Sequence, residues 1–152
     1  MLRALPLILL AAAAPAAAGE SSSVIAGSVD GVVGPILQPA TDPTYLDLAL
    51  EPGAQFVQAL PNDYAAFLYV FEGTLRVGEE EQVVGTHELA VLSEGSEIRL
   101  TGVTAGAGQG SARAILVAGR PLREPVAKYG PFVMNTRAEL QQAFEDFQNG
   151  RF

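Results

Sequence analysis

Tyr45-Leu46-Asp47-Leu48-Ala49-Leu50 is the stretch of this chain that shows its type of secondary structure most clearly. Successive side chains of a β-strand point to opposite faces, so the three leucines share one face and the residues between them share the other. A strict alternation of this kind is typical of a strand with one buried face. The stretch therefore predicts a half-buried β-strand.

Short apolar or alternating segments of the same kind follow this stretch, between closely spaced glycines and prolines. We expect further strands over residues 54–60, 65–72, 74–77, 82–84, 88–92, 97–100 and 112–118. No helical pattern separates them, which disfavours a sheet built from alternating strands and helices. The chain is predicted to be all-β, with its strands in an antiparallel sandwich or barrel.

Only the C-terminal segment changes to a helical period. Thr136-Arg137-Ala138-Glu139 fits a capping box, in which the threonine hydroxyl and the glutamate carboxylate each accept a hydrogen bond from a backbone N–H. The apolar residues that follow at helical spacing are Leu140, Ala143, Phe144 and Phe147. Gly150 ends the pattern, so we expect one amphipathic helix over about residues 136–149. Its apolar side must pack on the strands of the same chain, or on a second domain or chain.

Composition narrows the classes of function. The chain has 152 residues and a formal net charge of −8, with no cysteine and a single histidine. The acidic balance argues against a nucleic-acid-binding protein, because such binding starts with the neutralisation of phosphates. Without cysteine there is no disulfide framework, thiolate metal site or cysteine nucleophile, and one histidine cannot build the usual multi-histidine metal sites.

The first 18 residues have the parts of a secretory signal peptide. A basic start at Arg3 precedes an apolar run that is too short to span a bilayer, and residues 16–18 fit the small-residue cleavage pattern. We expect cleavage after Ala18, which leaves residues 19–152 as a single secreted or periplasmic domain with no membrane span. The alternative is a cytoplasmic protein with an alanine-rich extension or a misplaced start codon.

The end of the chain resembles a known family. Three motifs closely resemble the end of pirin-family sequences. They are Gly119-Arg120-Pro121-Leu122, Glu124-Pro125-Val126 and Tyr129-Gly130-Pro131-Phe132-Val133-Met134-Asn135-Thr136. Upstream, Tyr45-Leu46-Asp47, Glu51-Pro52-Gly53-Ala54 and Ala66-Phe67-Leu68-Tyr69-Val70-Phe71-Glu72-Gly73 look like the pirin C-terminal domain. Pirins are two-cupin proteins, so the resemblance implies one small antiparallel cupin-type β-barrel, a jelly roll, with a C-terminal α-helix.

The resemblance also implies where a metal belongs in this family. The N-terminal cupin of pirins carries the metal, usually iron, whereas the stretch found here corresponds to the C-terminal cupin. Counted along the general cupin motifs, the ligand positions of this chain fall on Ala59, Pro61, Ala66 and Ile98. None of these side chains can bind a metal, so we expect no metal and no catalytic residue, with iron only if a separate N-terminal-type cupin supplies it. An apolar interior is filled by side chains or holds an apolar ligand.

Two classes of function follow. The first is a metal-free cupin half that acts as a non-catalytic binding or protein-interaction domain, or that holds a small apolar molecule. Its expected partner surface, for self-association or for docking onto a separate cupin, comprises Phe132, Leu140, Phe144 and Phe147. The alternative is the quercetin 2,3-dioxygenase activity of some bacterial pirins, completed by a separate metal-bearing chain. A fragment of a two-domain pirin is the third interpretation.

Two polar features offer weaker candidates. His87 lies between two predicted strands, where a single histidine is typical of a solvated turn. The run Glu79-Glu80-Glu81 has the composition of a solvated hairpin tip, which also discourages aggregation between sheet edges.

Overall fold

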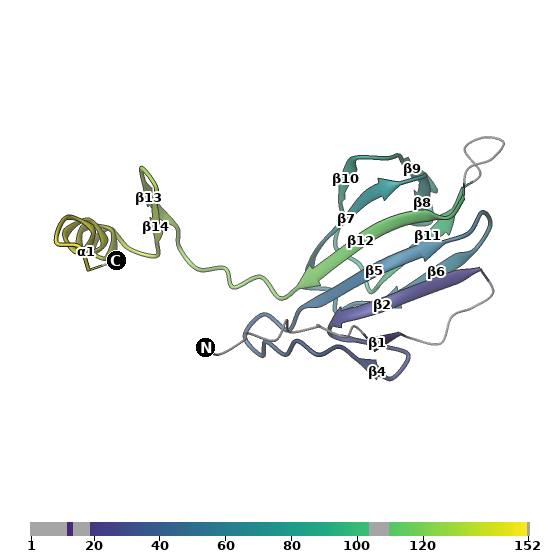
Figure 1. Cartoon of the computed structure of the whole chain (residues 1–152), viewed down its shortest axis with the longest axis horizontal. Coiled ribbons are helices and arrows are strands. Elements are labelled where there is room, and N and C mark those ends of the chain that lie inside the picture. The colour runs from purple at the N-terminus through teal and green to yellow at the C-terminus, as the bar shows by residue number, and fades with distance from the viewer. Residues whose placement is uncertain (1–11, 14–18, 104–109, 152) are drawn as a thin grey trace, which may run out of the picture. The chain divides into compact units, whose positions relative to one another are not determined.

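The computed structural model describes residues 12–13, 19–103 and 110–151, which belong to two compact units. The first unit extends to Pro121 and the second begins at Leu122. In its described part, the first unit consists of two larger antiparallel sheets and a short two-stranded one (Figure 1). The predicted leader and its cleavage site after Ala18 lie outside the described residues, apart from Ala12–Ala13, and stay a prediction.

The larger sheet has six strands in the order β1-β2-β5-β12-β7-β10, and every neighbouring pair is antiparallel. Its strands are β1 (Ala12–Ala13), β2 (Glu20–Ala26), β5 (Thr44–Leu50), β12 (Ala112–Gly119), β7 (Ala65–Glu72) and β10 (Glu88–Val91). Strands that are distant in sequence therefore lie side by side, as β12 does between β5 and β7. This order is that of a jelly roll and not of a simple meander.

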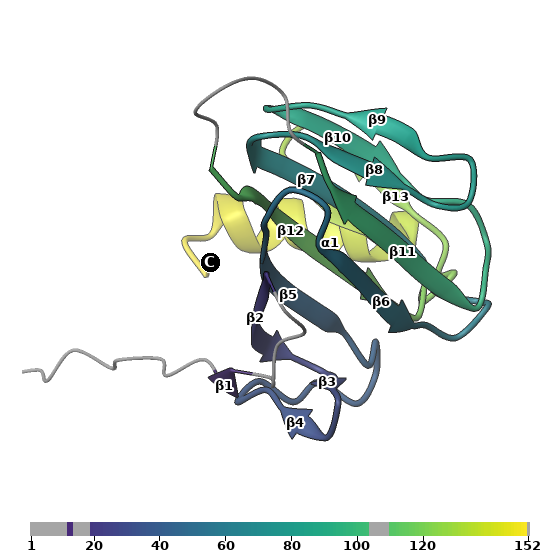
Figure 2. The same ribbon diagram turned by 90° about the vertical axis from the view of Figure 1, so that its right-hand side faces the viewer.

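The smaller sheet has four strands in the order β6-β11-β8-β9. They are β6 (Gln55–Ala59), β11 (Glu97–Gly102), β8 (Leu75–Val77) and β9 (Gln82–Val84), and a short separate hairpin joins β3 (Ser28–Val29) to β4 (Val32–Val33). Figure 2 shows the six-stranded and the four-stranded sheet as facing layers. The predicted all-β antiparallel jelly roll is confirmed, as two facing sheets and not as a closed barrel.

The core lies between these two sheets. Burial alternates along the whole of β5, and Leu46, Leu48 and Leu50 are completely buried. Leu75 and Leu100 face them from the smaller sheet and are also completely buried. Each such side chain contributes about 1.5–3 kcal/mol relative to exposure. The alternation read from the sequence therefore identifies the principal apolar face of the unit.

Every strand predicted from the sequence is confirmed, with end points that differ by at most two residues. The pattern does not predict β2, because its first half is a glutamate followed by three serines, residue types that are not enriched in strands. Pairing with β5 holds this segment in the sheet, with Val24 opposite Leu46. Tertiary contacts here override a weak local preference.

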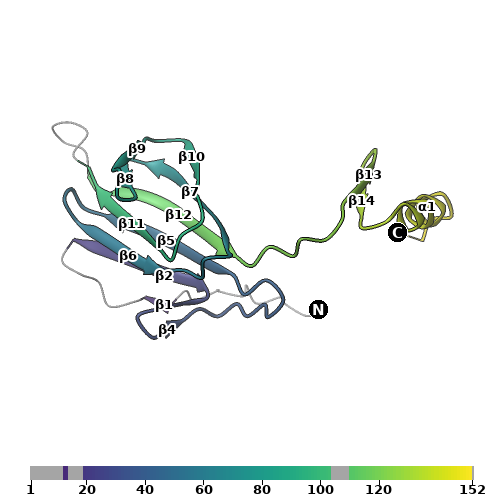
Figure 3. The ribbon, with the colours of Figure 1, turned by 180° about the vertical axis from the view of Figure 1, so that it is seen from behind.

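The second unit is a hairpin packed on a helix. Strands β13 (Ala127–Tyr129) and β14 (Phe132–Met134) pair antiparallel across a two-residue turn. Gly130 has φ of +55°, which a left-handed turn position requires, and Pro131 follows it. The predicted helix is confirmed as α1 (Arg137–Gln148), and the view from behind in Figure 3 shows the hairpin and α1 next to each other.

A complete capping box starts α1, as predicted. The backbone N–H of Glu139 donates to Thr136 Oγ1 over 3.2 Å, and Glu139 Oε2 accepts from the backbone N–H of Thr136 over 2.8 Å. The same oxygen accepts from the N–H of Asn135 over 3.0 Å. These hydrogen bonds, above all that from the Thr136 backbone, lower the pKa of Glu139 below its ordinary value of 4.5.

We predict that acid weakens this helix start. Because the folded-state pKa of Glu139 is depressed, its contribution is complete above pH 4.5 and is lost as the pH falls through that lower folded-state pKa. In an NMR titration, the amide protons of Asn135 and Thr136 should shift together as the carboxylate is protonated. Glu139→Gln keeps an acceptor but does not titrate, so the same two amides should stay still. Wild-type amides that do not move at acidic pH would contradict the prediction.

Candidate functional site

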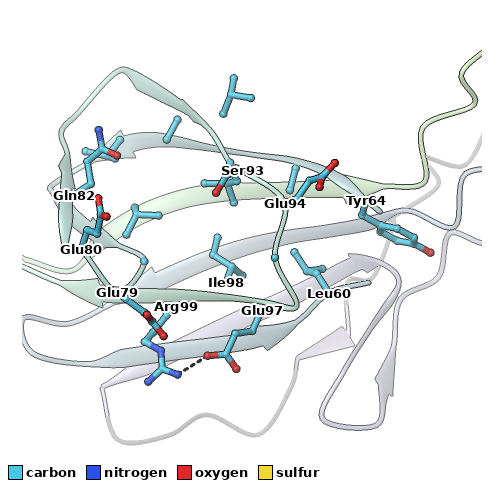
Figure 4. A pocket seen from close by; sticks show the side chains of 18 of the residues that line it. Leu60, Tyr64, Glu79, Glu80, Gln82, Ser93, Glu94, Glu97, Ile98 and Arg99 are labelled. Atoms are coloured by element: carbon cyan, nitrogen blue, oxygen red, sulfur yellow. Dashed lines mark hydrogen bonds and ion pairs between the residues drawn. The ribbon is translucent and has the colours of Figure 1, made fainter. Parts of the chain in front are cut away.

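A cavity of about 440 Å³ opens between the two sheets (Figure 4). Both sheets contribute its carbon lining: β7 and β10 from the larger one, and β8, β9 and β11 from the smaller. The apolar side chains that line it include Leu60, Ala66, Val77, Val84, Ala90 and Ile98. Its volume is in the range of small-molecule sites in proteins, which is about 300–1,000 Å³.

Three of the four positions where cupin motifs place metal ligands lie at this cavity. Pro61, Ala66 and Ile98 line it, and Ile98 is almost completely buried. Ala59 does not line it: it ends β6 as an exposed residue, between half-buried Gln58 and buried Leu60. The structure thus brings three of these positions together and separates the fourth: Ala59 is the last residue of β6 and lies on its exposed face, whereas Pro61 lies beyond the end of that strand, where its alternation no longer holds.

The side chains at these four positions do not fit a metal. Each consists of carbon and hydrogen only, whereas iron in proteins is held by nitrogen, oxygen or sulfur ligands. Among the described residues, no group of three or more histidines, cysteines, aspartates and glutamates is placed so that it could hold a metal ion.

Acidic side chains surround the cavity. Glu79, Glu80, Glu94 and Glu97 line it together with a single cation, Arg99, whose Nη2 donates a hydrogen bond to Glu97 Oε1. That hydrogen bond, followed by the charges of Glu97 and Glu79, raises the pKa of Arg99. Four carboxylates and one guanidinium leave a negative surplus at this site.

The run Glu79-Glu80-Glu81 joins β8 to β9 and is exposed, as expected of a hairpin tip. Its members differ in their surroundings, however. Glu81 forms an ion pair with Arg76 at 3.3 Å and does not line the cavity, whereas Glu79 and Glu80 do. The sequence alone does not show this, because the hairpin register decides which acids turn toward the cavity.

Two other polar residues have structural roles. The Tyr64 hydroxyl donates to Asp42 Oδ2 over 2.5 Å, and Figure 4 shows that hydroxyl turned away from the cavity. This hydrogen bond is the main cause of the raised pKa of Tyr64. His87 is exposed in a turn with φ of +66°, its backbone N–H donates to the Val70 carbonyl, and it does not line the cavity.

The four residues of the predicted partner surface gather in the second unit. The ring of Phe132 lies 4.8 Å from that of Phe144 and 5.7 Å from that of Phe147, centroid to centroid. Leu140 is only 8% exposed, so it belongs to the small core of this unit, whereas Phe147 is 62% exposed. Tyr129, which the sequence patterns did not single out, stands 5.3 Å from Phe144 and completes the aromatic cluster.

Sequence patterns also missed an apolar area on the outer face of the larger sheet. Leu89 and Val91 on β10 are exposed, Val91 to 80%, and Phe67 on β7 pairs with Val91 across the strands. Residues 65–71 are apolar at every position, which is the signal of a strand with two apolar faces. Among the described residues, no helix is long and apolar enough to cross a membrane.

Comparison with known proteins places this fold in a family. The family model described as the pirin C-terminal cupin domain matches residues 45–152. The chain belongs to the pirin family. It is 42% identical over 135 residues to a pirin-like protein of Caulobacter vibrioides, covering 88% of this chain and 46% of that protein. It is 35% identical over 139 residues to human pirin, covering 90% and 46% of the two chains.

The fold of this chain is also similar to that of a solved structure. The crystal structure of a quercetin 2,3-dioxygenase from Acinetobacter baumannii superimposes with a TM-score of 0.73 and 30% sequence identity, covering 88% of this chain and 44% of that one. The chain spans about half the length of the relatives that it matches.

Proposed function

We propose that this chain acts as a metal-free, non-catalytic binding domain of the pirin family. The observation that supports it most directly is the carbon lining at Pro61, Ala66 and Ile98, where cupin motifs would place metal ligands. Side chains of this kind neither bind iron nor transfer a proton. They do form the type of surface that holds the apolar part of a small molecule.

The proposal has a second component, a protein partner at the second unit. Phe147 is largely exposed beside Phe132 and Phe144, and aromatic clusters of this kind are common in protein interfaces. The partner is a second copy of this chain or a separately encoded cupin.

The alternative function is dioxygenase activity of the pirin type. The likeness to the Acinetobacter baumannii enzyme favours it, since the matched part of that enzyme has the same fold at 30% identity. The residues of this chain do not fit iron at the cupin positions, so the alternative requires a separate chain that supplies the metal site.

We further propose that residues 1–18 are removed on export to the periplasm or the medium. Within that segment, the structure describes only β1, whose two residues pair with Val24 and Ser23 at the edge of the larger sheet. N-terminal sequencing of the protein expressed from the full reading frame should begin at Gly19. A soluble form that keeps Met1 would contradict the export proposal.

The binding function predicts that the purified chain holds no stoichiometric iron and does not turn over quercetin when ferrous iron is added. The reason is the absence of donor atoms at Pro61, Ala66 and Ile98. Metal analysis and oxygen uptake measure the two properties, with a full-length dioxygenase of the family as the positive control. One tightly held iron per chain would contradict the assignment of the ligand positions to Ala59, Pro61, Ala66 and Ile98. Turnover that a chelator abolishes would support dioxygenase activity.

The partner component predicts self-association that depends on Phe147. Phe147→Ser should raise the dissociation constant of the oligomer by at least about tenfold in light scattering, because an exposed aromatic anchor is lost. Gln148→Ser, at the exposed end of the same helix, is the matched control and should leave association unchanged. Phe144 is less suitable, since it packs inside the unit. A wild-type monomer that exposes no dye-binding apolar surface would count against the partner.

A further inference from the structure

We propose that the cavity selects small organic cations, namely molecules with an apolar body and one positively charged group such as a primary amine. This inference rests on the proposed function, because it assumes that the cavity binds a small molecule. It adds the charge of that molecule, which the carbon lining alone does not determine.

The first argument is the distribution of polarity around the cavity. Its carbon-lined part comes from strands of both sheets, whereas the carboxylates come from the segment between β8 and β9, the segment after β10 and the start of β11. In Figure 4, Ile98 lies between Glu80 on one side and Glu94 on the other. A bound molecule can therefore place an apolar body against Ile98 and a charged end near a carboxylate.

The second argument is the sign of the charge. Glu79, Glu80, Glu94 and Glu97 line the cavity together with a single cation, Arg99, which already donates to Glu97. Glu97 and Arg99 flank buried Ile98 on β11, so their paired side chains leave that strand on the face opposite Ile98. A ligand carboxylate placed against Ile98 would therefore meet the negative charges of Glu79, Glu80 and Glu94, while the one lining cation is paired with Glu97. An ammonium group meets the opposite situation, because each of the glutamates that line the cavity attracts it.

The third argument distinguishes an organic cation from a metal ion. The glutamates that line the cavity come from three segments, and only Glu79 and Glu80 are neighbours in sequence. The described residues contain no group of three or more histidines, cysteines, aspartates and glutamates placed to hold a metal ion. Attraction to separate, solvated carboxylates is weak for any one pair. The affinity of a ligand then depends on its apolar contact with side chains such as Ala90 and Ile98. An inorganic cation makes no such contact.

Three molecules that share a phenylbutyl body and differ in charge test the preference for a cation directly. They are 4-phenylbutylamine, 4-phenylbutanol and 4-phenylbutanoate. In calorimetric or NMR titrations at low salt, we expect the amine to bind at least about fivefold more tightly than the alcohol, and the carboxylate to bind most weakly. High salt screens the charges of the glutamates that line the cavity. At about 0.5 M sodium chloride, the affinities for the amine and for the alcohol should therefore agree within about twofold.

Charge variants locate the effect. The double variant Glu80→Gln and Glu94→Gln should lower the affinity for the amine by at least about threefold and leave that for the alcohol within about twofold. The matched control is Glu51→Gln with Glu72→Gln, two exposed acids outside the cavity whose loss changes the net charge equally. This control should affect neither probe. All four positions are exposed, so both double variants should fold.

A filling variant locates the body of the probe. Ala90→Phe places a ring in the cavity and should abolish binding of the amine and of the alcohol alike, with circular dichroism as the check on folding. Equal affinity for amine and alcohol at low salt, or tighter binding of the carboxylate, would overturn the charge inference and leave the proposed function standing. Failure of all three probes to bind wild-type protein would overturn both.

Discussion

The rest of the structure depends on one constraint: two sheets face each other, and the side chains that point inward from both must fill the space between them. Leu46, Leu48 and Leu50 fill the space on β5, and Leu68 does so on β7. The cavity opens where the inward side chains become small: half-buried Ala66 shares the inner face of β7 with Leu68, and Ala90 lies opposite Leu68 on β10. A leucine at either alanine position would fill this space, so the cavity is a consequence of residue size at those two positions.

Local patterns of the chain determine much of this architecture, and the sequence predicts those parts well. A period of two identifies β5 because burial of one face forces the alternation, and short continuous apolar runs identify β7 and β12. The capping box locates the start of α1 because its hydrogen bonds join residues three apart. The same reasoning fails for β2, whose serines carry no strand signal, and for β13 and β14, which are three residues long and joined by Gly130 and Pro131.

The cavity is less accessible to sequence reasoning, because its lining comes from strands that only the fold brings together. Of the four positions counted along cupin motifs, Pro61, Ala66 and Ile98 line the cavity, whereas Ala59 lies on the exposed side of β6 and does not. The acids show the same limit. Composition predicts that residues 79–81 are solvated, but the pairing of β8 with β9 is what separates Glu81, held by Arg76, from its two neighbours at the cavity.

Size is the physical reason to expect a partner for the second unit. A hairpin and a helix of this length are smaller than the roughly 40 residues below which chains rarely stay folded without further support. Leu140 and Ala143 are the buried apolar residues of α1, and disulfides are excluded because the chain has no cysteine. The aromatic cluster around Phe144 adds about 0.5–1.5 kcal/mol per ring pair, which is small beside the entropy of ordering the segment. The proposed partner would supply the missing stabilisation by covering an apolar surface, and Phe147, exposed to 62%, is the side chain of α1 best placed for that contact.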